Sequence, residues 1–201
     1  MKTSLMTVKS SGGGMSEALA VTENIGTEMG LDKKSVLRTR LLAEELFGML
    51  RGIAGDVEAT YWLEAEDKQI EMHMKADVKM TDDMKEQFLA ASSSGKNYAA
   101  KGFMGKLKVM IADVLLSMKE MAPYSMVNTV SYDPTGGVGG ETVSVWSMMA
   151  YKDEVRKQMT ASKEARDAWD ELEKSIVANI ADDVKVKIVG KNVEIIVYKT
   201  F

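Results

Sequence analysis

Residues 69–76, Gln-Ile-Glu-Met-His-Met-Lys-Ala, decide the fold because their apolar and polar side chains alternate without a break. Successive side chains of a strand point to opposite faces of a sheet. The apolar members therefore share one face and the polar members the other: Ile70, Met72, Met74 and Ala76 against Glu71, His73 and Lys75. This pattern predicts a strand that buries one face and leaves the other in water.

The residues before this strand predict a hairpin and a long helix. Residues 56–63 are rich in strand formers, and residues 64–68 supply a polar turn to the strand at 69–76. Further upstream, Asp32 is suited to open a helix that runs to about Gly55. Positions three and four apart share one face of a helix, which predicts a buried stripe. That stripe comprises Leu42, Leu46, Met49, Leu50 and Ile53.

The N-terminal segment predicts one more strand and one more helix. Residues 5–8 form a short apolar run, and residues 10–14 read Ser-Ser-Gly-Gly-Gly, which is typical of a turn. We expect a helix after this turn with Ser16 as its N-cap. Gly30 is suited to end that helix, because glycine adopts the left-handed conformation common after a helix.

Downstream of residue 77 the pattern predicts helices, one strand and a final hairpin. Helical spacing is present in residues 82–91 and 100–121, and a Gly- and Pro-containing connection at 133–140 precedes a strand at 141–148. Residues 153–180 predict one long helix or two broken ones. The chain then alternates on both sides of a turn at 190–192, with Val184, Val186, Ile188, Val193, Ile195 and Val197 as apolar members. This order predicts a two-layer α/β sandwich, with helices on one face of a mixed, mostly antiparallel sheet.

Composition excludes several classes of site. The formal net charge is −4, whereas a nucleic-acid groove needs a concentrated basic surface. The chain has no cysteine and a single histidine, so thiolate metal sites are excluded and we expect no metal centre. No stretch approaches the roughly 18 apolar residues of a membrane span. We therefore expect a cytoplasmic protein that binds neither nucleic acid nor a membrane.

Isolated features that could carry chemistry have simpler interpretations. We expect His73 to be an exposed histidine on the polar face of its strand, because nothing nearby in sequence orients it for catalysis. The three tryptophans, Trp62, Trp146 and Trp169, are expected to be core aromatics. The glycines at 136–140 lack the lysine followed by Ser or Thr that completes a phosphate-binding P-loop.

One segment carries a resemblance to a known family. Residues 41–54, Leu-Leu-Ala-Glu-Glu-Leu-Phe-Gly-Met-Leu-Arg-Gly-Ile-Ala, resemble the first ATP-binding helix of the GHKL ATPases, and most of all that of the small bacterial anti-sigma serine kinases. In that group the helix is followed by two strands, a loop, a glycine-containing segment that opens a helix, and a strand after paired glycines. The same order continues here to Gly139 and Gly140, so the resemblance covers about three-quarters of the chain.

The resemblance implies site residues but also marks departures from the family. Its helix motif places a catalytic glutamate at Glu45, then an asparagine and a histidine at positions that hold Met49 and Ile53 here. A thioether and an alkyl chain cannot replace an amide oxygen on magnesium, which prefers oxygen ligands. Both residues instead extend the apolar stripe.

The other two family motifs survive only in part. The adenine-reading aspartate matches Asp77, but the glycine positions after it hold Lys79 and Thr81. The phosphate-binding glycine pair has an echo in Gly102 and Gly105, at a different spacing. A helix start suits an anion, so these two glycines are the candidate phosphate contacts.

The resemblance divides the chain into a GHKL-like domain at 1–150 and a helix-plus-hairpin extension at 151–201 that packs on the same domain. It implies a regulatory or signalling module that binds another protein, such as a sigma or anti-anti-sigma-type regulator or a second copy of itself. No cofactor is expected, with ATP binding weak at most. Two alternatives stay open: a divergent ATP-dependent serine kinase that uses Glu45, with Asp56 or Asp82 as the magnesium ligand, and an unrelated α/β protein with an accidental helix match.

Overall fold

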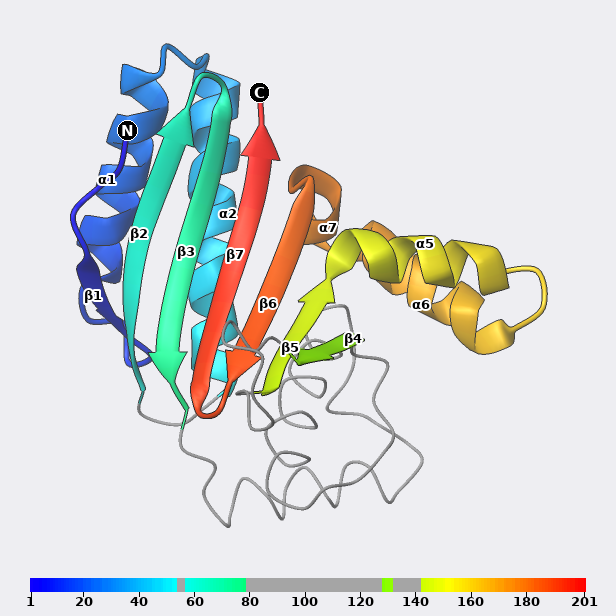
Figure 1. Cartoon of the computed structure of the whole chain (residues 1–201). Coiled ribbons are helices and arrows are strands. Elements are labelled where there is room, and N and C mark those ends of the chain that lie inside the picture. Colours follow the sequence, from blue (N-terminus) through cyan, green and yellow to red (C-terminus); the bar gives the residue numbers. More distant parts are fainter. Residues whose placement is uncertain (54–56, 79–127, 132–141) are drawn as a thin grey trace.

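The computed structural model describes residues 1–53, 57–78, 128–131 and 142–201 of the chain. Seven strands in these ranges form one sheet, in the order β1-β2-β3-β7-β6-β5-β4 (Figure 1). The strands are β1 (Met6–Lys9), β2 (Glu58–Glu66), β3 (Gln69–Asp77), β4 (Asn128–Ser131), β5 (Thr142–Ser147), β6 (Asp183–Val189) and β7 (Asn192–Thr200). Every neighbouring pair is antiparallel, so the expected parallel pairing in a mixed sheet is wrong for the described strands. The tight turns fix the direction of two of these pairs, β2–β3 and β6–β7, because a two-residue turn can join only antiparallel strands.

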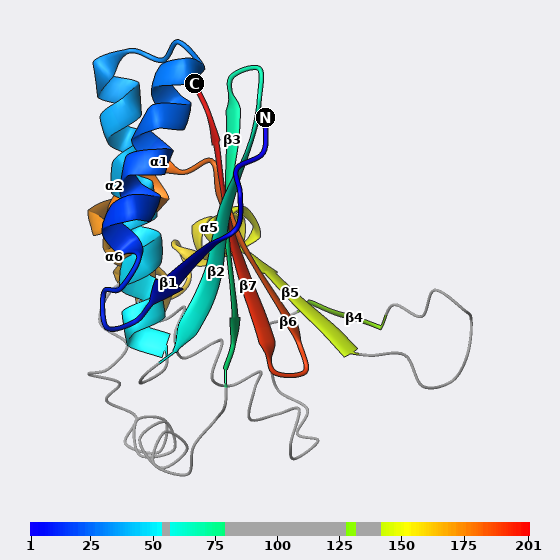
Figure 2. The same ribbon diagram turned by 90° about the vertical axis from the view of Figure 1, so that its left-hand side faces the viewer.

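Five described helices accompany the sheet. They are α1 (Met15–Glu28), α2 (Lys33–Ile53), α5 (Met148–Gln158), α6 (Lys163–Lys174) and α7 (Ile176–Ile180). Figure 2 shows α1 and α2 side by side on one face of the sheet, which gives the helix layer and sheet layer that the sequence predicts. The helical hairpin α5–α6 projects beside the sheet and has a small apolar cluster of its own (Figure 1). None of the helices in the described ranges combines the length and the apolar composition that crossing a bilayer requires.

The core lies between the sheet and the helices α1 and α2. The alternation in β3 is confirmed, because Ile70, Met72 and Met74 are at most 2 % exposed. They belong to one cluster with four members of the α2 stripe, Leu42, Leu46, Met49 and Leu50. The corresponding residues of β2, β6 and β7 lie on the same face, since the strand register pairs them across the sheet: Tyr61, Leu63, Val184, Val186, Ile188, Val193, Ile195 and Val197. Each buried side chain of this size contributes about 1.5–3 kcal/mol relative to exposure, so this face dominates the stability.

Helix ends follow local backbone chemistry, with one difference from the sequence prediction. Helix α1 begins at Met15 rather than after Ser16, and its N-cap is Gly14 at φ 74°. Only glycine fits there, because a Cβ on Gly14 would lie 2.1 Å from the carbonyl oxygen of Thr7 in β1. The predicted end of α1 is confirmed, since Gly30 has φ 71° directly after the helix. Asp32 opens α2 as predicted, and its Oδ1 accepts a 2.7 Å hydrogen bond from the Ser35 amide.

The region after β5 is more broken than the sequence indicates. The expected one or two helices over residues 153–180 are three, and α5 already starts at Met148. Ser162 and Ser175 cause the two interruptions, because each adopts an extended backbone and its side chain caps the helix that follows. The C-terminal hairpin is confirmed, with Val189 and Asn192 as the last pair before its turn.

This C-terminal hairpin occupies the middle of the sheet. Strand β7 pairs with β3 on one side, from Asn192 opposite Asp77 to Thr200 opposite Gln69, and with β6 on the other. Residues beyond 151, which the family resemblance treats as an addition, therefore supply two central strands of the same sheet as β1–β3.

Candidate functional site

The α2 helix carries the residues that the family resemblance assigns to catalysis. Glu45 is partly exposed on this helix, one turn before Met49. The Met49 side chain is 1 % exposed and belongs to the core cluster with Leu46 and Leu50. The side chain at the magnesium-ligand position is therefore enclosed by apolar neighbours, whereas the glutamate is not. Ile53 is the last residue of α2.

Asp77 lies at the end of β3, where the resemblance requires the adenine-reading aspartate. It is exposed and stands opposite Asn192 in the strand register. The C-terminal end of α2 lies on the same side of the molecule as the C-terminal end of β3 (Figure 1). This is because β2 starts soon after α2, and Ala59 at the start of β2 pairs with Ala76 near the end of β3. The fold thus brings the C-terminal end of α2 and Asp77 to one end of the two layers.

The remaining family-derived candidates lie outside the described residues. These are the glycines Gly102 and Gly105 and the alternative magnesium ligands Asp56 and Asp82. Within the described ranges, no group of three or more His, Asp or Glu side chains is arranged to hold a metal ion.

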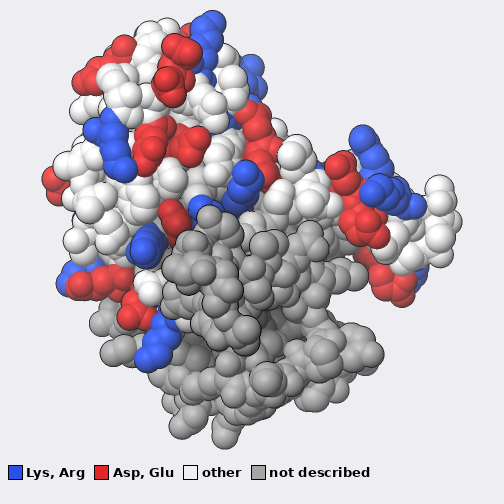
Figure 3. Space-filling model, in the orientation of Figure 1, with Lys and Arg blue, Asp and Glu red and all other residues white. Residues whose placement is uncertain are grey.

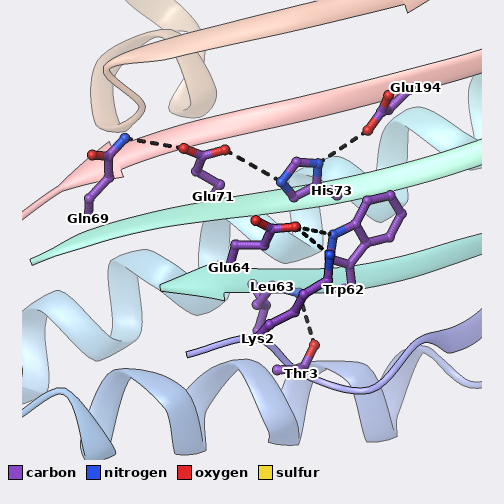
Figure 4. A network of polar contacts seen from close by, with 9 residues as sticks. All are labelled: Lys2, Thr3, Trp62, Leu63, Glu64, Gln69, Glu71, His73 and Glu194. Atoms are coloured by element: carbon purple, nitrogen blue, oxygen red, sulfur yellow. Dashed lines mark hydrogen bonds and ion pairs between the residues drawn. The ribbon is translucent and has the colours of Figure 1, made fainter. Parts of the chain in front are cut away.

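A second polar site lies on the sheet face opposite α1 and α2, which we call the open face. Figure 3 shows acidic and basic side chains interspersed among the described residues of this face. On this face the indole of Trp62 in β2 stacks on the imidazole of His73 in β3, with ring centroids 4.6 Å apart and planes within 9° (Figure 4). Two expectations are wrong here: Trp62 lies on the open face rather than in the core, and His73 is only 8 % exposed.

Carboxylates surround the stacked pair. His73 Nδ1 lies 3.2 Å from Oε1 of Glu194, which belongs to β7. The other ring nitrogen, Nε2, lies 3.5 Å from Oε2 of Glu71, which belongs to β3 like His73 itself. The Trp62 indole N–H donates to Glu64 Oε1 over 3.0 Å, and Lys2 Nζ reaches the same oxygen at 2.8 Å. Both hydrogen bonds lower the pKa of Glu64, and the bond from Lys2 has the larger effect.

A hollow of about 450 Å³ adjoins this network at the upper end of β2 and β3. Glu64, Glu66 and Glu71 line it together with Lys2 and the N-terminal residue Met1. The chain start is held there by antiparallel contacts with β2, among them Thr3 N–H to the Leu63 carbonyl. Because opposite charges already meet in the hollow, its geometry alone does not select a ligand.

A buried carboxylate elsewhere serves the structure. Asp183, 7 % exposed at the start of β6, accepts hydrogen bonds from the Ser147 hydroxyl at 3.1 Å and from the Met149 amide at 2.9 Å. Ser147 is the N-cap of α5 and Met149 lies in its first turn, where the positive end of the helix favours a negative charge. Asp183 therefore joins α5 to the sheet. The sequence carried no local signal for this role because Ser147 and Met149 are more than thirty residues away.

The Tyr61 hydroxyl is another buried polar group that the sequence did not indicate. Its oxygen lies 2.9 Å from Thr22 Oγ1 of α1, inside the core. Burial raises the pKa of Tyr61 far above its ordinary value, so the phenol stays neutral and links the sheet to the helix layer.

Comparison with known proteins found no relative of this chain. No family model matches this sequence, and the comparisons with curated proteins and with solved structures gave no match either.

Proposed function

We propose that this chain is a regulatory module with a GHKL-like fold that binds another protein and does not turn over ATP. The observation that carries the proposal is the burial of Met49. Its side chain, four residues after Glu45, is enclosed in the core at the position where the family places a magnesium-binding amide. An enclosed thioether can neither coordinate magnesium nor reach a phosphate in a solvent-filled cleft.

The order and placement of the elements support the GHKL-like part of the proposal. Helix α2 precedes the antiparallel pair β2–β3, Asp77 follows at the end of β3, and β5 begins at Thr142, shortly after Gly139 and Gly140. The helix ends on the same side of the molecule as Asp77. This is the arrangement that the family uses to present its helix and its aspartate to one nucleotide.

The lost glycines support the absence of turnover. After Asp77 the sequence has Lys79 and Thr81 at positions where the family uses glycine for a close approach of the backbone. An aspartate without these neighbours lacks the backbone contacts to the nucleotide. Binding of a partner protein is the remaining role of such a scaffold. By analogy with the anti-sigma kinases, that partner is a sigma or anti-anti-sigma-type regulator.

Nucleotide binding is the direct test of the proposal. A ligand that binds only the native state raises its apparent stability by mass action. We expect the thermal midpoint of the full chain to be the same with and without millimolar ATP and magnesium, and calorimetry to give no binding heat. Binding of magnesium-ATP in the micromolar range would overturn the proposal.

The alternative, a divergent serine kinase, is favoured by the partial exposure of Glu45, which leaves its carboxylate accessible for use as a base. Radiolabelled phosphate transfer to a protein substrate distinguishes the two functions. A kinase should lose transfer on Glu45→Gln but keep it on Glu44→Gln. Glu44 is a fit control because it is exposed and paired with Arg40 at 2.8 Å. Equal transfer by both variants would exclude Glu45 as the base.

Restoring the missing amide provides a further check. Met49→Asn places a polar group in the packed core, and we expect it to lower the free energy of unfolding by about 2–4 kcal/mol. The variant should gain no affinity for magnesium-ATP, because the side chain at this position is enclosed. A gain in affinity would mean that this helix position borders the nucleotide after all.

A further inference from the structure

The two ring nitrogens of His73 have different surroundings. Nδ1 lies 3.2 Å from Oε1 of Glu194, within hydrogen-bond distance. Nε2 is buried and has no hydrogen-bond partner among the described residues. An ionised carboxylate only accepts hydrogen bonds, so a neutral ring that is bonded to Glu194 carries its proton on Nδ1 and keeps a bare lone pair on Nε2. The open face therefore contains a buried nitrogen ligand without a partner.

The bare nitrogen faces the carboxylate of Glu71, two residues earlier in β3. Glu71 Oε2 lies 3.5 Å from His73 Nε2, and Figure 4 shows the two atoms directed toward each other. In the neutral ring and the ionised carboxylate neither atom carries a proton, so two lone pairs face one another. Two ligands of one tetrahedral Zn²⁺, each about 2.0–2.2 Å from the metal, lie roughly 3.3–3.5 Å apart. The observed separation matches that of such a ligand pair.

Neighbouring side chains orient both members of this pair. Metal-binding histidines in proteins commonly donate their other ring N–H to a carboxylate, which fixes the tautomer and the ring orientation, and Glu194 stands in that position here. Trp62 stacks on the imidazole with centroids 4.6 Å apart and restricts the ring further. On the other side, Gln69 Nε2 lies 3.5 Å from Glu71 Oε1, the oxygen that does not face His73. The two ligand atoms are thus positioned before any ion binds.

Acidic charge is concentrated beside the pair. Glu64 of β2 stands directly opposite Glu71 in the strand register, and like charges in this arrangement are destabilising. Both glutamates line the hollow of about 450 Å³, together with Glu66. Lys2, which lies 2.8 Å from Glu64, compensates only one of these carboxylates. The Glu71 side chain is 32 % exposed, so a dissolved cation can reach it from the hollow.

We propose that His73 Nε2 and Glu71 Oε2 bind a divalent transition-metal ion such as Zn²⁺. An imidazole nitrogen suits zinc, copper or nickel, whereas magnesium and calcium prefer oxygen ligands alone. Glu64 supplies a third ligand when it exchanges Lys2 for the ion, and water completes the coordination. In the structure Glu64 is bound to Lys2, so no group of three is preformed within the described ranges. One histidine is enough for such a site, although the composition alone led us to expect no metal centre.

The test is a titration of the full chain with zinc chloride, followed by nuclear magnetic resonance of the imidazole nitrogens. Because the chain has a single histidine, the two ¹⁵N signals belong to His73 without further assignment. We expect the Nε2 signal to shift and to saturate at one bound ion per chain, while Nδ1 keeps its bond to Glu194 and shifts less. Excess magnesium chloride should leave both signals in place, because magnesium avoids nitrogen ligands. A ring that does not respond to zinc, or that responds equally to magnesium, would overturn the proposal.

Calorimetry with zinc chloride on variants tests the ligands one by one. Glu194→Ala removes only the group behind the ring and should weaken zinc binding by about 10–100-fold. His73→Gln and Glu71→Gln remove a ligand and should weaken it at least as much. Glu66→Gln is the matched control, since Glu66 lines the same hollow at the exposed end of β2, and it should keep the wild-type affinity. If His73→Gln does not fold, the partly exposed Glu71 gives the test alone. Equal zinc affinities for Glu71→Gln and Glu66→Gln would mean a general attraction to acidic charge and would exclude the site.

Discussion

The two faces of strand β3 carry different kinds of interaction on one backbone. Ile70, Met72 and Met74 face α1 and α2 and are at most 2 % exposed. Between them, Glu71 and His73 face away from the helices and contact charged or aromatic groups from other strands. The helix-covered face contributes stability through the amount of apolar surface buried, whereas the open face depends on which polar group meets which. Four substitutions test how far this division holds.

The largest effect is expected on the helix-covered face. Met72→Ala removes a fully buried side chain and should lower the free energy of unfolding by about 2–5 kcal/mol, through lost burial and the cavity left behind. Urea denaturation measures the change. Lys75→Ala, on the exposed side of the same strand, is the control and should stay within about 0.5 kcal/mol. Similar losses for the two variants would contradict the division of the faces.

Asp183 should be the exception that sharpens the comparison. It shares its register with the open face, opposite Tyr198, yet it is buried and caps α5. We expect Asp183→Ala to lower the free energy of unfolding by about 2–3 kcal/mol, because the Ser147 hydroxyl and the Met149 amide lose their hydrogen-bond acceptor. Circular dichroism during denaturation should show the loss. The exposed neighbour Asp182, bound to Lys199, is the control and should matter less.

The converse exception is a polar atom on the apolar face. Tyr61→Phe removes the hydroxyl that contacts Thr22, and we expect a loss of about 1 kcal/mol in chemical denaturation. Adding Thr22→Val should recover part of that loss, because both polar partners are then gone. A double variant that is less stable than the sum of the two single changes would rule out this pairing.

The smallest effect is expected at Glu64 on the open face, and it depends on pH. Its pKa is lowered below the ordinary value of 4.5, chiefly by the hydrogen bond from Lys2. A carboxyl group with a lowered folded-state pKa stabilises the fold above its unfolded pKa, and that contribution is lost as pH falls through the folded value. Glu64→Gln should therefore be slightly less stable than the wild type at neutral pH.

The gap in thermal midpoint between Glu64→Gln and the wild type should close in acid, below the range where the carboxylate is ionised. Lys2→Met should show the same pH profile, since it removes the other half of the pair. A gap that widens as pH falls would be the opposite sign and would exclude this contact as its source.

The sequence was sufficient for those parts of the fold that depend on burial. Alternation in residues 69–76 predicted which side chains of β3 face the core, and the stripe in α2 predicted that Met49 is enclosed. Gly30 and Asp32 predicted helix ends because their effect is local. In each case the deciding interaction lies within a few residues or follows from apolar character alone.

The polar site around Trp62 and His73 could not be predicted, because its interactions join different strands and are not local in the sequence. The exposed His73 and the core Trp62 that the sequence indicated are both wrong. His73 contacts Glu194, 121 residues away in the chain, and Trp62 stacks on His73 of the neighbouring strand. Polar groups on an open face are specified by strand order and register, and neither is encoded locally. Ser16 as N-cap failed differently, since the contact of Gly14 with β1 fixed the N-cap of α1 two residues earlier.

The position of β7 bears on how the protein is made. Strands β1 to β3 leave the ribosome early, but the strand that covers the free edge of β3 spans residues Asn192–Thr200 and emerges after all the other described elements. Until then the growing chain presents an unpaired edge that other strands can join. Slow translation therefore prolongs the exposure of that edge, and a nascent chain interrupted before β7 cannot unite the two halves of its sheet.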